Sequence, residues 1–149
     1  MTRARAVASL VFVVTGCSLN PQPGAPDRAV ADREAVALAV IGQDELTEAA
    51  ARGVTLTTVL SRRVSNFAVA QHSNVGSCPV ITLRGTKSME LSSEPVLYID
   101  GMRTLDTCLL ESLPLRDLSL VEVYGTGQAP PGSTIGGAAG GLILVHTKR

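Results

Sequence analysis

Short apolar segments separated by turn residues fill the last third of the chain, and they constrain the fold more than any other feature. Val96 to Asp100 is a strand of apolar residues that ends at an aspartate, and Asp100-Gly101 predicts a turn after it. Leu120–Tyr124 predicts a strand in which Val121 and Val123 share one face while Glu122 points to the other, because successive side chains of a strand alternate between its faces. Leu142–Val145 is apolar on both faces, which is typical of a central strand. These segments predict a β-sheet.

The residues between these strands predict a short helix and a long glycine-rich loop. Leucines at 105, 109, 110 and 113 suggest a helix that Pro114 stops, and Asp117 begins a further helical turn. Gly125–Gly141 then precedes the last strand. A phosphate-binding loop follows a strand and opens onto a helix, which is the opposite order. We therefore interpret these glycines as allowing close backbone approach and positive φ, and we predict no nucleotide site.

The preceding part of the chain predicts two helices and two further strands. The predicted strands are Val36–Ile41 and Pro79–Gly85, and the predicted helices are Gln43–Arg52 and Leu56–Arg63. Gly53 is placed to end the first helix, and Thr55 is placed to cap the second. We expect an α+β fold, in which a small mixed sheet of four to five strands carries these two N-terminal helices on one face. The four strands expected to form one sheet are Val80–Leu83, Val96–Ile99, Leu120–Val123 and Leu142–Val145.

Several of these segments resemble one receptor family. The stretches PVLYIDG (95–101), LVEVYG (120–125) and GGLILVHTK (140–148) resemble the plug domain of TonB-dependent outer-membrane receptors. ITLRG (81–85) and the helix–glycine–helix unit extend the resemblance back to about Val36. In those receptors the plug fills a β-barrel and contributes loops to ligand binding. The resemblance ends where the barrel would follow, and it therefore implies a plug without its own pore.

The N-terminus resembles a bacterial lipoprotein signal. Arg3 and Arg5 form a short positive region ahead of the apolar run Ala6–Gly16, which is too short for the roughly 20 residues of a membrane-spanning helix. The run ends in VTGC, which resembles a lipobox and implies lipidation of Cys17. The alternative is an ordinary secretory signal with a buried cysteine. Ser18, rather than aspartate, follows the cysteine, which favours the outer membrane.

Three segments follow from these predictions: a signal peptide at 1–16, a flexible linker at 17–35 and the plug-like domain at 36–149. Four residues in the linker disfavour helix and sheet, and they are Pro21, Pro23, Gly24 and Pro26. Receptors of the family often carry a short box near here that the TonB protein binds. The sequence shows no convincing version of this box.

The cysteine count indicates a disulfide. The chain has three cysteines, and lipidation of Cys17 leaves Cys78 and Cys108 in a compartment that favours disulfides. The alternative is two separate buried thiols. A metal site with His72 and His146 has enough ligands, but it lacks the C-x-x-C or H-x-x-x-H spacing of known sites. We predict a disulfide and no metal or cofactor.

Composition and motifs argue against nucleic-acid binding and catalysis. The net charge is zero, and loss of the signal leaves 11 basic and 13 acidic side chains, so no basic stripe is available. Asp100 is predicted to accept backbone N–H bonds in a turn. Glu122 is predicted to form an ion pair with Arg84 or Arg103. No G-x-S-x-G elbow or second placed carboxylate suggests an enzyme.

We therefore expect a lipid-anchored binding module of the bacterial outer membrane, accessory to a TonB-dependent transporter. It would contact a barrel or transporter protein through the loops Ser65–Ser77, Thr86–Ser93 and Gly125–Ser133, because loops carry binding more often than cores do. Two other hypotheses stay open. One is a truncated or degenerate receptor remnant, and the other is a small-ligand-binding lipoprotein that delivers a solute to a transporter.

Overall fold

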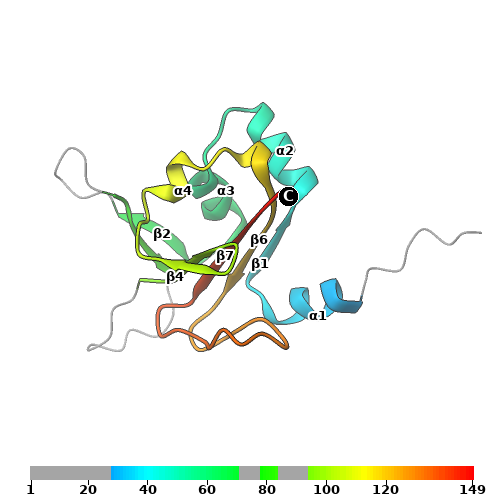
Figure 1. Cartoon of the computed structure of the whole chain (residues 1–149). Helices are drawn as coiled ribbons and strands as arrows, with labels where there is room; N and C mark the ends of the chain where they lie inside the picture. The colour runs from blue at the N-terminus through cyan, green and yellow to red at the C-terminus, as the bar shows by residue number, and fades with distance from the viewer. Residues whose placement is uncertain (1–27, 71–77, 84–93) are drawn as a thin grey trace, which may run out of the picture.

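The computed structural model describes residues 28–70, 78–83 and 94–149, without the side chains of residues 28–31. Its centre is a mixed five-stranded sheet with the strand order β1-β6-β7-β4-β5 (Figure 1). A two-stranded sheet of β2 and β3 lies beside it. The elements are α1 Arg28–Val36, β1 Ala39–Gly42, α2 Gln43–Ala51, α3 Leu56–Arg63, β2 Phe67–Ala70, β3 Val80–Leu83, β4 Val96–Ile99, β5 Met102–Thr104, α4 Leu109–Ser112, the 3-10 turn Leu115–Asp117, β6 Leu118–Tyr124 and β7 Leu142–Thr147. The predicted α+β class is confirmed.

Strand β7 lies in the middle of the main sheet, as its sequence predicts. It pairs antiparallel with β6 and parallel with β4, and Leu142–Val145 are all buried. Strands β4 and β5 form a hairpin through Asp100 and Gly101, which have φ values of 49° and 81°. Two successive residues with positive φ suit a two-residue hairpin turn, and glycine at the second position adopts it without steric cost.

The two predicted N-terminal helices cover one face of the main sheet. Helices α2 and α3 lie on the same side as α4 (Figure 1), and their apolar side chains join those of β1, β6 and β7 in one core. Thr55 caps α3 by accepting a hydrogen bond from the backbone N–H of Thr58. Gly53 follows α2 with a φ of 67°, as a residue just past a helix end often does. Both predicted helix boundary signals are therefore confirmed.

The opposite face is covered by the glycine-rich loop and by α1. Tyr124, Leu142 and Leu144 point to this face and pack against residues that include Ile135 and Ala138 of the loop. The helix Arg28–Val36 differs from the predicted linker, which ran through residue 35. The helix begins after the prolines that disfavour helical structure, so the local argument from those prolines does not apply to it. The rest of that linker, residues 17–27, lies outside the described residues.

The strand assignment is wrong around β2 and β3, and the first predicted strand begins at Ala39 rather than at Val36, which belongs to α1. Phe67–Ala70 lies within the predicted loop Ser65–Ser77, but it forms β2 and pairs antiparallel with β3. Strand β3 was expected in the main sheet, but it belongs to this hairpin, and β1 and β5 complete the main sheet instead. The hairpin still contributes to the core, because Phe67, Ile81 and Leu83 are buried in it.

The short helix before Pro114 is also smaller than predicted. Helix α4 spans only Leu109–Ser112, whereas Leu105 precedes it with 82% of its surface exposed. Strand β5 ends at Thr104, directly before Leu105, so the helix cannot begin as early as the leucine pattern predicts. The turn expected to start at Asp117 ends there instead.

Gly140 is expected to tolerate no side chain. A Cβ atom at this position would overlap the backbone carbonyl of Glu94, so Gly140→Ala must shift one of two backbone segments beside β4 and β7. We expect a loss of about 2 kcal/mol in the free energy of unfolding, measured by urea denaturation. Gly136→Ala is the matched control, because a Cβ there meets nothing within 4 Å and should change stability by less than about 0.5 kcal/mol. Equal stability of the two variants would contradict the close approach.

Candidate functional site

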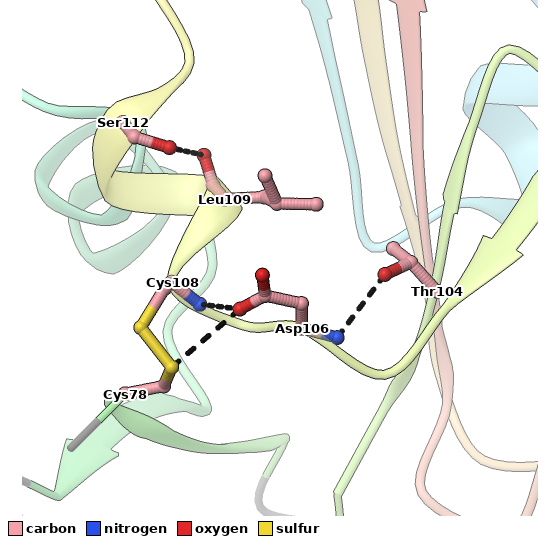
Figure 2. The surroundings of a disulfide bond; sticks show 6 residues. All are labelled: Cys78, Thr104, Asp106, Cys108, Leu109 and Ser112. Atoms are coloured by element: carbon pink, nitrogen blue, oxygen red, sulfur yellow. Dashed lines mark hydrogen bonds between the residues drawn. A yellow bond between two sulfur atoms is a disulfide. The ribbon is translucent and has the colours of Figure 1, made fainter.

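Two cysteines predicted to pair are joined in the structure. The disulfide joins Cys78, which lies two positions before β3, to Cys108, which lies just before α4 (Figure 2). It therefore ties the β2–β3 hairpin to the segment that leaves the main sheet after β5. The predicted lipidation site, Cys17, lies outside the described residues. Within the described part of the chain, no helix has the length and apolar character needed to cross a membrane.

A carboxylate lies directly against this disulfide. Oδ1 of Asp106 accepts a hydrogen bond of 3.0 Å from the backbone N–H of Cys108 and lies 3.5 Å from Sγ of Cys78 (Figure 2). The backbone N–H of Asp106 donates to Oγ1 of Thr104 at 3.1 Å. These bonds hold the Asp106 side chain over the two sulfur atoms, although Asp106 itself is exposed.

A second charged cluster is centred on the buried Glu122. Its Oε2 atom lies 3.2 Å from Nε2 of His146, and its Oε1 atom lies 3.7 Å from Nε of Arg33 and accepts a 3.3 Å hydrogen bond from the Tyr124 hydroxyl. The Glu122 side chain is only 3% exposed, whereas those of Arg33 and His146 are about 40% exposed. The cluster thus joins β6, β7 and α1 on the face that α1 covers.

The partners of Glu122 differ from the prediction. Arg33 and His146 occupy the roles expected of Arg84 or Arg103, and Arg84 lies outside the described residues. The alternation of β6 does predict that Glu122 points away from Val121 and Val123, and this is confirmed. The sequence does not pair His146 with Glu122, because the two residues lie 24 positions apart and approach each other only through the pairing of β6 with β7.

The surroundings of Glu122 favour its ionised form. Burial raises the pKa of the carboxyl group, but the hydrogen bond with His146, the charges of Arg33 and His146 and the Tyr124 hydroxyl together lower it below its usual range. Burial and the neighbouring Glu122 charge raise the pKa of Tyr124 to about 12. The Tyr124 hydroxyl therefore stays protonated and donates to Glu122.

We expect Glu122 to make the free energy of unfolding decrease at acid pH. Because folding lowers its pKa, the stabilisation is complete above its ordinary value of about 4.5 and is lost as the pH falls through the lower folded value. Urea denaturation between about pH 6 and about pH 3 should show a smaller acid loss for Glu122→Gln than for the unchanged protein. Asp100 also has a lowered pKa because of its bonds to Thr147, but it contributes equally to both proteins. Identical pH profiles would contradict the prediction.

A shallow hollow of about 670 Å³ lies where β7 ends and β6 begins. It is lined by Gly101 and by seven residues with polar or charged side chains, namely Gln43, Asp100, Ser119, His146, Thr147, Lys148 and Arg149. Asp100 accepts hydrogen bonds from both the backbone N–H and the hydroxyl of Thr147, at 2.8 and 2.7 Å. It is therefore the turn residue that the sequence predicts, and its two oxygens brace the end of β7.

One of the three loops expected to meet a partner is described in full. Residues 126–128 and 131–133 of Gly125–Ser133 are exposed, so this loop is open to contact. Gln128 is nevertheless part of the loop's own structure, because its side-chain oxygen accepts a 2.9 Å hydrogen bond from the backbone N–H of Gly125. In the loop Ser65–Ser77, residues 67–70 form β2, and residues 71–77 lie outside the described residues, as does Thr86–Ser93.

Comparison with known proteins bears on the fold. No protein-family model matches the chain, and no curated protein matches its sequence. Among solved structures, the chain is similar to the RagAB peptide importer in its open-open state, at 22% identity and a TM-score of 0.50. That match covers 76% of this chain and 12% of the other. The importer in its closed-closed state matches at 21% identity and a TM-score of 0.46, over 74% of this chain and 12% of the other. The chain therefore has the fold of a small part of a much larger protein in that importer.

Proposed function

We propose that this protein is a lipid-anchored, plug-like binding module of the bacterial outer membrane, accessory to a TonB-dependent transporter. The observation that carries the proposal is the likeness in fold to a part of a peptide importer. The sequence motifs at 95–101, 120–125 and 140–148 support the same family independently. A fold alone does not define a function, so the proposal depends on a partner and a location that experiments can test.

The proposed mode of action is binding without chemistry. The described surface offers the exposed loop Gly125–Ser133, which is the first part of the connection from β6 to β7. The close backbone approach of Gly137 to Gly127 holds it in place. A loop with a fixed backbone and exposed side chains meets a partner with little loss of conformational entropy. The acyl chains on Cys17 would keep the domain at the membrane, since each buried CH₂ contributes about 0.8 kcal/mol.

Location is tested with Cys17→Ser. In a Gram-negative bacterium the unchanged protein should sediment with the outer membrane, and mass spectrometry should find an acylated Cys17 as its first residue. Cys17→Ser should be released into the soluble fraction, because a membrane anchor needs the lipidated thiol. An unmodified N-terminus at another residue would contradict the lipid anchor.

The partner is tested by crosslinking from the loop. A photoreactive residue at the exposed Thr126 should yield an adduct with an outer-membrane β-barrel protein, whereas one at the exposed Arg62 of α3 serves as control on the opposite face. Adducts at both positions, or at neither, would contradict a specific interface at the loop. A receptor remnant without function predicts no adduct at either position.

A second candidate, binding of a small solute, is favoured by the hollow at the end of β7. Its volume of about 670 Å³ falls within the range of small-ligand sites, and the polar side chains around it could orient a bound solute. If this function holds, a bound solute should shift the NMR signals of Gln43, Ser119 and His146, and not those of the loop Gly125–Ser133.

A further inference from the structure

The disulfide and its neighbouring carboxylate bring three metal-ligand groups to one place. The sulfur atoms of Cys78 and Cys108 and a carboxylate oxygen of Asp106 all lie within 4.8 Å of one another (Figure 2). The carboxylate needs no rearrangement to reach this position, because Cys108 and Thr104 already hold the Asp106 residue there. Among the described residues, nothing bonds to its second oxygen, Oδ2. Three metal ligands are therefore close together, and the sulfur–sulfur bond prevents the two sulfur atoms from binding a metal ion.

We propose that the reduced protein binds one Zn²⁺ ion through the thiolates of Cys78 and Cys108 and the carboxylate of Asp106. A dithiol reductant first transfers two electrons and two protons to the disulfide, which yields two thiols while the reductant becomes a disulfide. Zn²⁺ then displaces one proton from each thiol. The two thiolates and the carboxylate carry three negative charges, and the ion reduces the net charge to −1. Water completes the four ligands that Zn²⁺ prefers.

The donor set selects the class of metal. Thiolate sulfur favours soft and borderline ions such as Zn²⁺ and Cd²⁺, whereas Mg²⁺ and Ca²⁺ take oxygen ligands. The negative charge of Asp106 beside the sulfur atoms opposes free thiolates, and a divalent cation removes this repulsion. Because binding releases two protons, the affinity should fall by up to about a hundredfold for each unit that the pH is lowered.

The bound ion would replace the covalent link with a coordinate one. In the oxidised protein the disulfide ties the β2–β3 hairpin to the segment before α4. In the reduced protein the Zn²⁺ ion would join the same two segments, so the hairpin would stay attached. Reduction without metal would leave the hairpin attached only by its packing on the core.

The test uses the full chain carrying Cys17→Ser, so that only two thiols are present. The protein is reduced with a phosphine, freed of reductant under argon and titrated with Zn²⁺ against a chromophoric chelator. We expect one ion per reduced chain and none per oxidised chain. Cd²⁺ should produce thiolate charge-transfer absorption in the reduced chain, and Zn²⁺ should raise its midpoint of thermal unfolding.

The variant Asp106→Asn distinguishes binding at the proposed three-residue site from Zn²⁺ binding by two thiols alone. Asparagine keeps the side-chain oxygen that accepts the hydrogen bond from the backbone N–H of Cys108. Equal midpoints of thermal unfolding for the oxidised Asp106→Asn protein and the oxidised unchanged protein would therefore show an intact fold. Zn²⁺ affinity should fall at least about tenfold, since losing a residue that merely supports a ligand costs about 10- to 100-fold. Glu111→Gln, an exposed carboxylate on α4, should leave affinity unchanged. Binding that persists in the oxidised chain, or that is equal in Asp106→Asn, would overturn the proposal.

Discussion

Replacing Val121 by aspartate is expected to leave the chain unfolded. Val121 is fully buried in the middle of β6, where it pairs with Ile41 of β1 and Val145 of β7. The described core offers no cation on this side of the sheet, so the new carboxylate would be buried without a partner. That costs several kcal/mol, which is comparable to the 5–15 kcal/mol that typically stabilises a whole domain. Circular dichroism and gel filtration should show loss of cooperative melting and an expanded chain.

Val69→Asp is the matched control for this variant. Val69 lies in a strand too, but it is 38% exposed at β2, so the added carboxylate can remain hydrated. We expect this protein to fold and to melt cooperatively, with a change of about 1 kcal/mol or less. A folded Val121→Asp protein with normal melting would contradict the position of β6 at the centre of the core.

Removing the disulfide is expected to have the second largest effect. The double variant Cys78→Ser, Cys108→Ser frees a loop closed across 30 residues of sequence, which should lower the free energy of unfolding by about 3 to 4 kcal/mol on the chain-entropy model. Urea denaturation of the oxidised protein and of the double variant measures the difference. The double variant avoids a single unpaired thiol, which would add its own chemistry.

Thiol counting tests the same bond directly. The unfolded, unreduced protein carrying Cys17→Ser should contain no reactive thiol, because both remaining cysteines are in the disulfide. Cys17→Ser alone should leave the stability of the domain unchanged, which provides the control. Two reactive thiols, or a double variant as stable as the oxidised protein, would contradict the structural role of the bond.

Features determined by a few neighbouring residues could be predicted from the sequence. Gly53 and Thr55 mark the end of α2 and the start of α3 because a residue with positive φ and a side-chain cap act within one turn. Asp100 and Gly101 specify a hairpin turn for the same reason. The four apolar residues at 142–145 predict a central strand, since only a strand covered on both faces buries them all.

The candidate sites could be predicted only in part. The cysteine count indicates that Cys78 and Cys108 pair, but the carboxylate of Asp106 reaches the sulfur atoms through a local turn that the sequence does not reveal. Alternation along β6 predicts the face on which Glu122 lies. It does not predict that Arg33 and His146 are its partners, because these residues belong to other elements.

Pairing between distant segments was decided only in the tertiary structure. The pattern of β3 fits the main sheet as well as it fits a separate hairpin. The choice depends on β2, whose four-residue apolar run FAVA is too short to identify as a strand without its partner. The Arg33–Glu122 ion pair joins helix α1 to the sheet, although these two residues lie far apart in the sequence. Local sequence thus determined α2, α3, the β4–β5 turn and β7, because turn and capping preferences and the burial of a central strand act over a few residues. Strand order, the second sheet and the charged cluster depend on which surfaces meet when the chain collapses, and no local pattern contains that information.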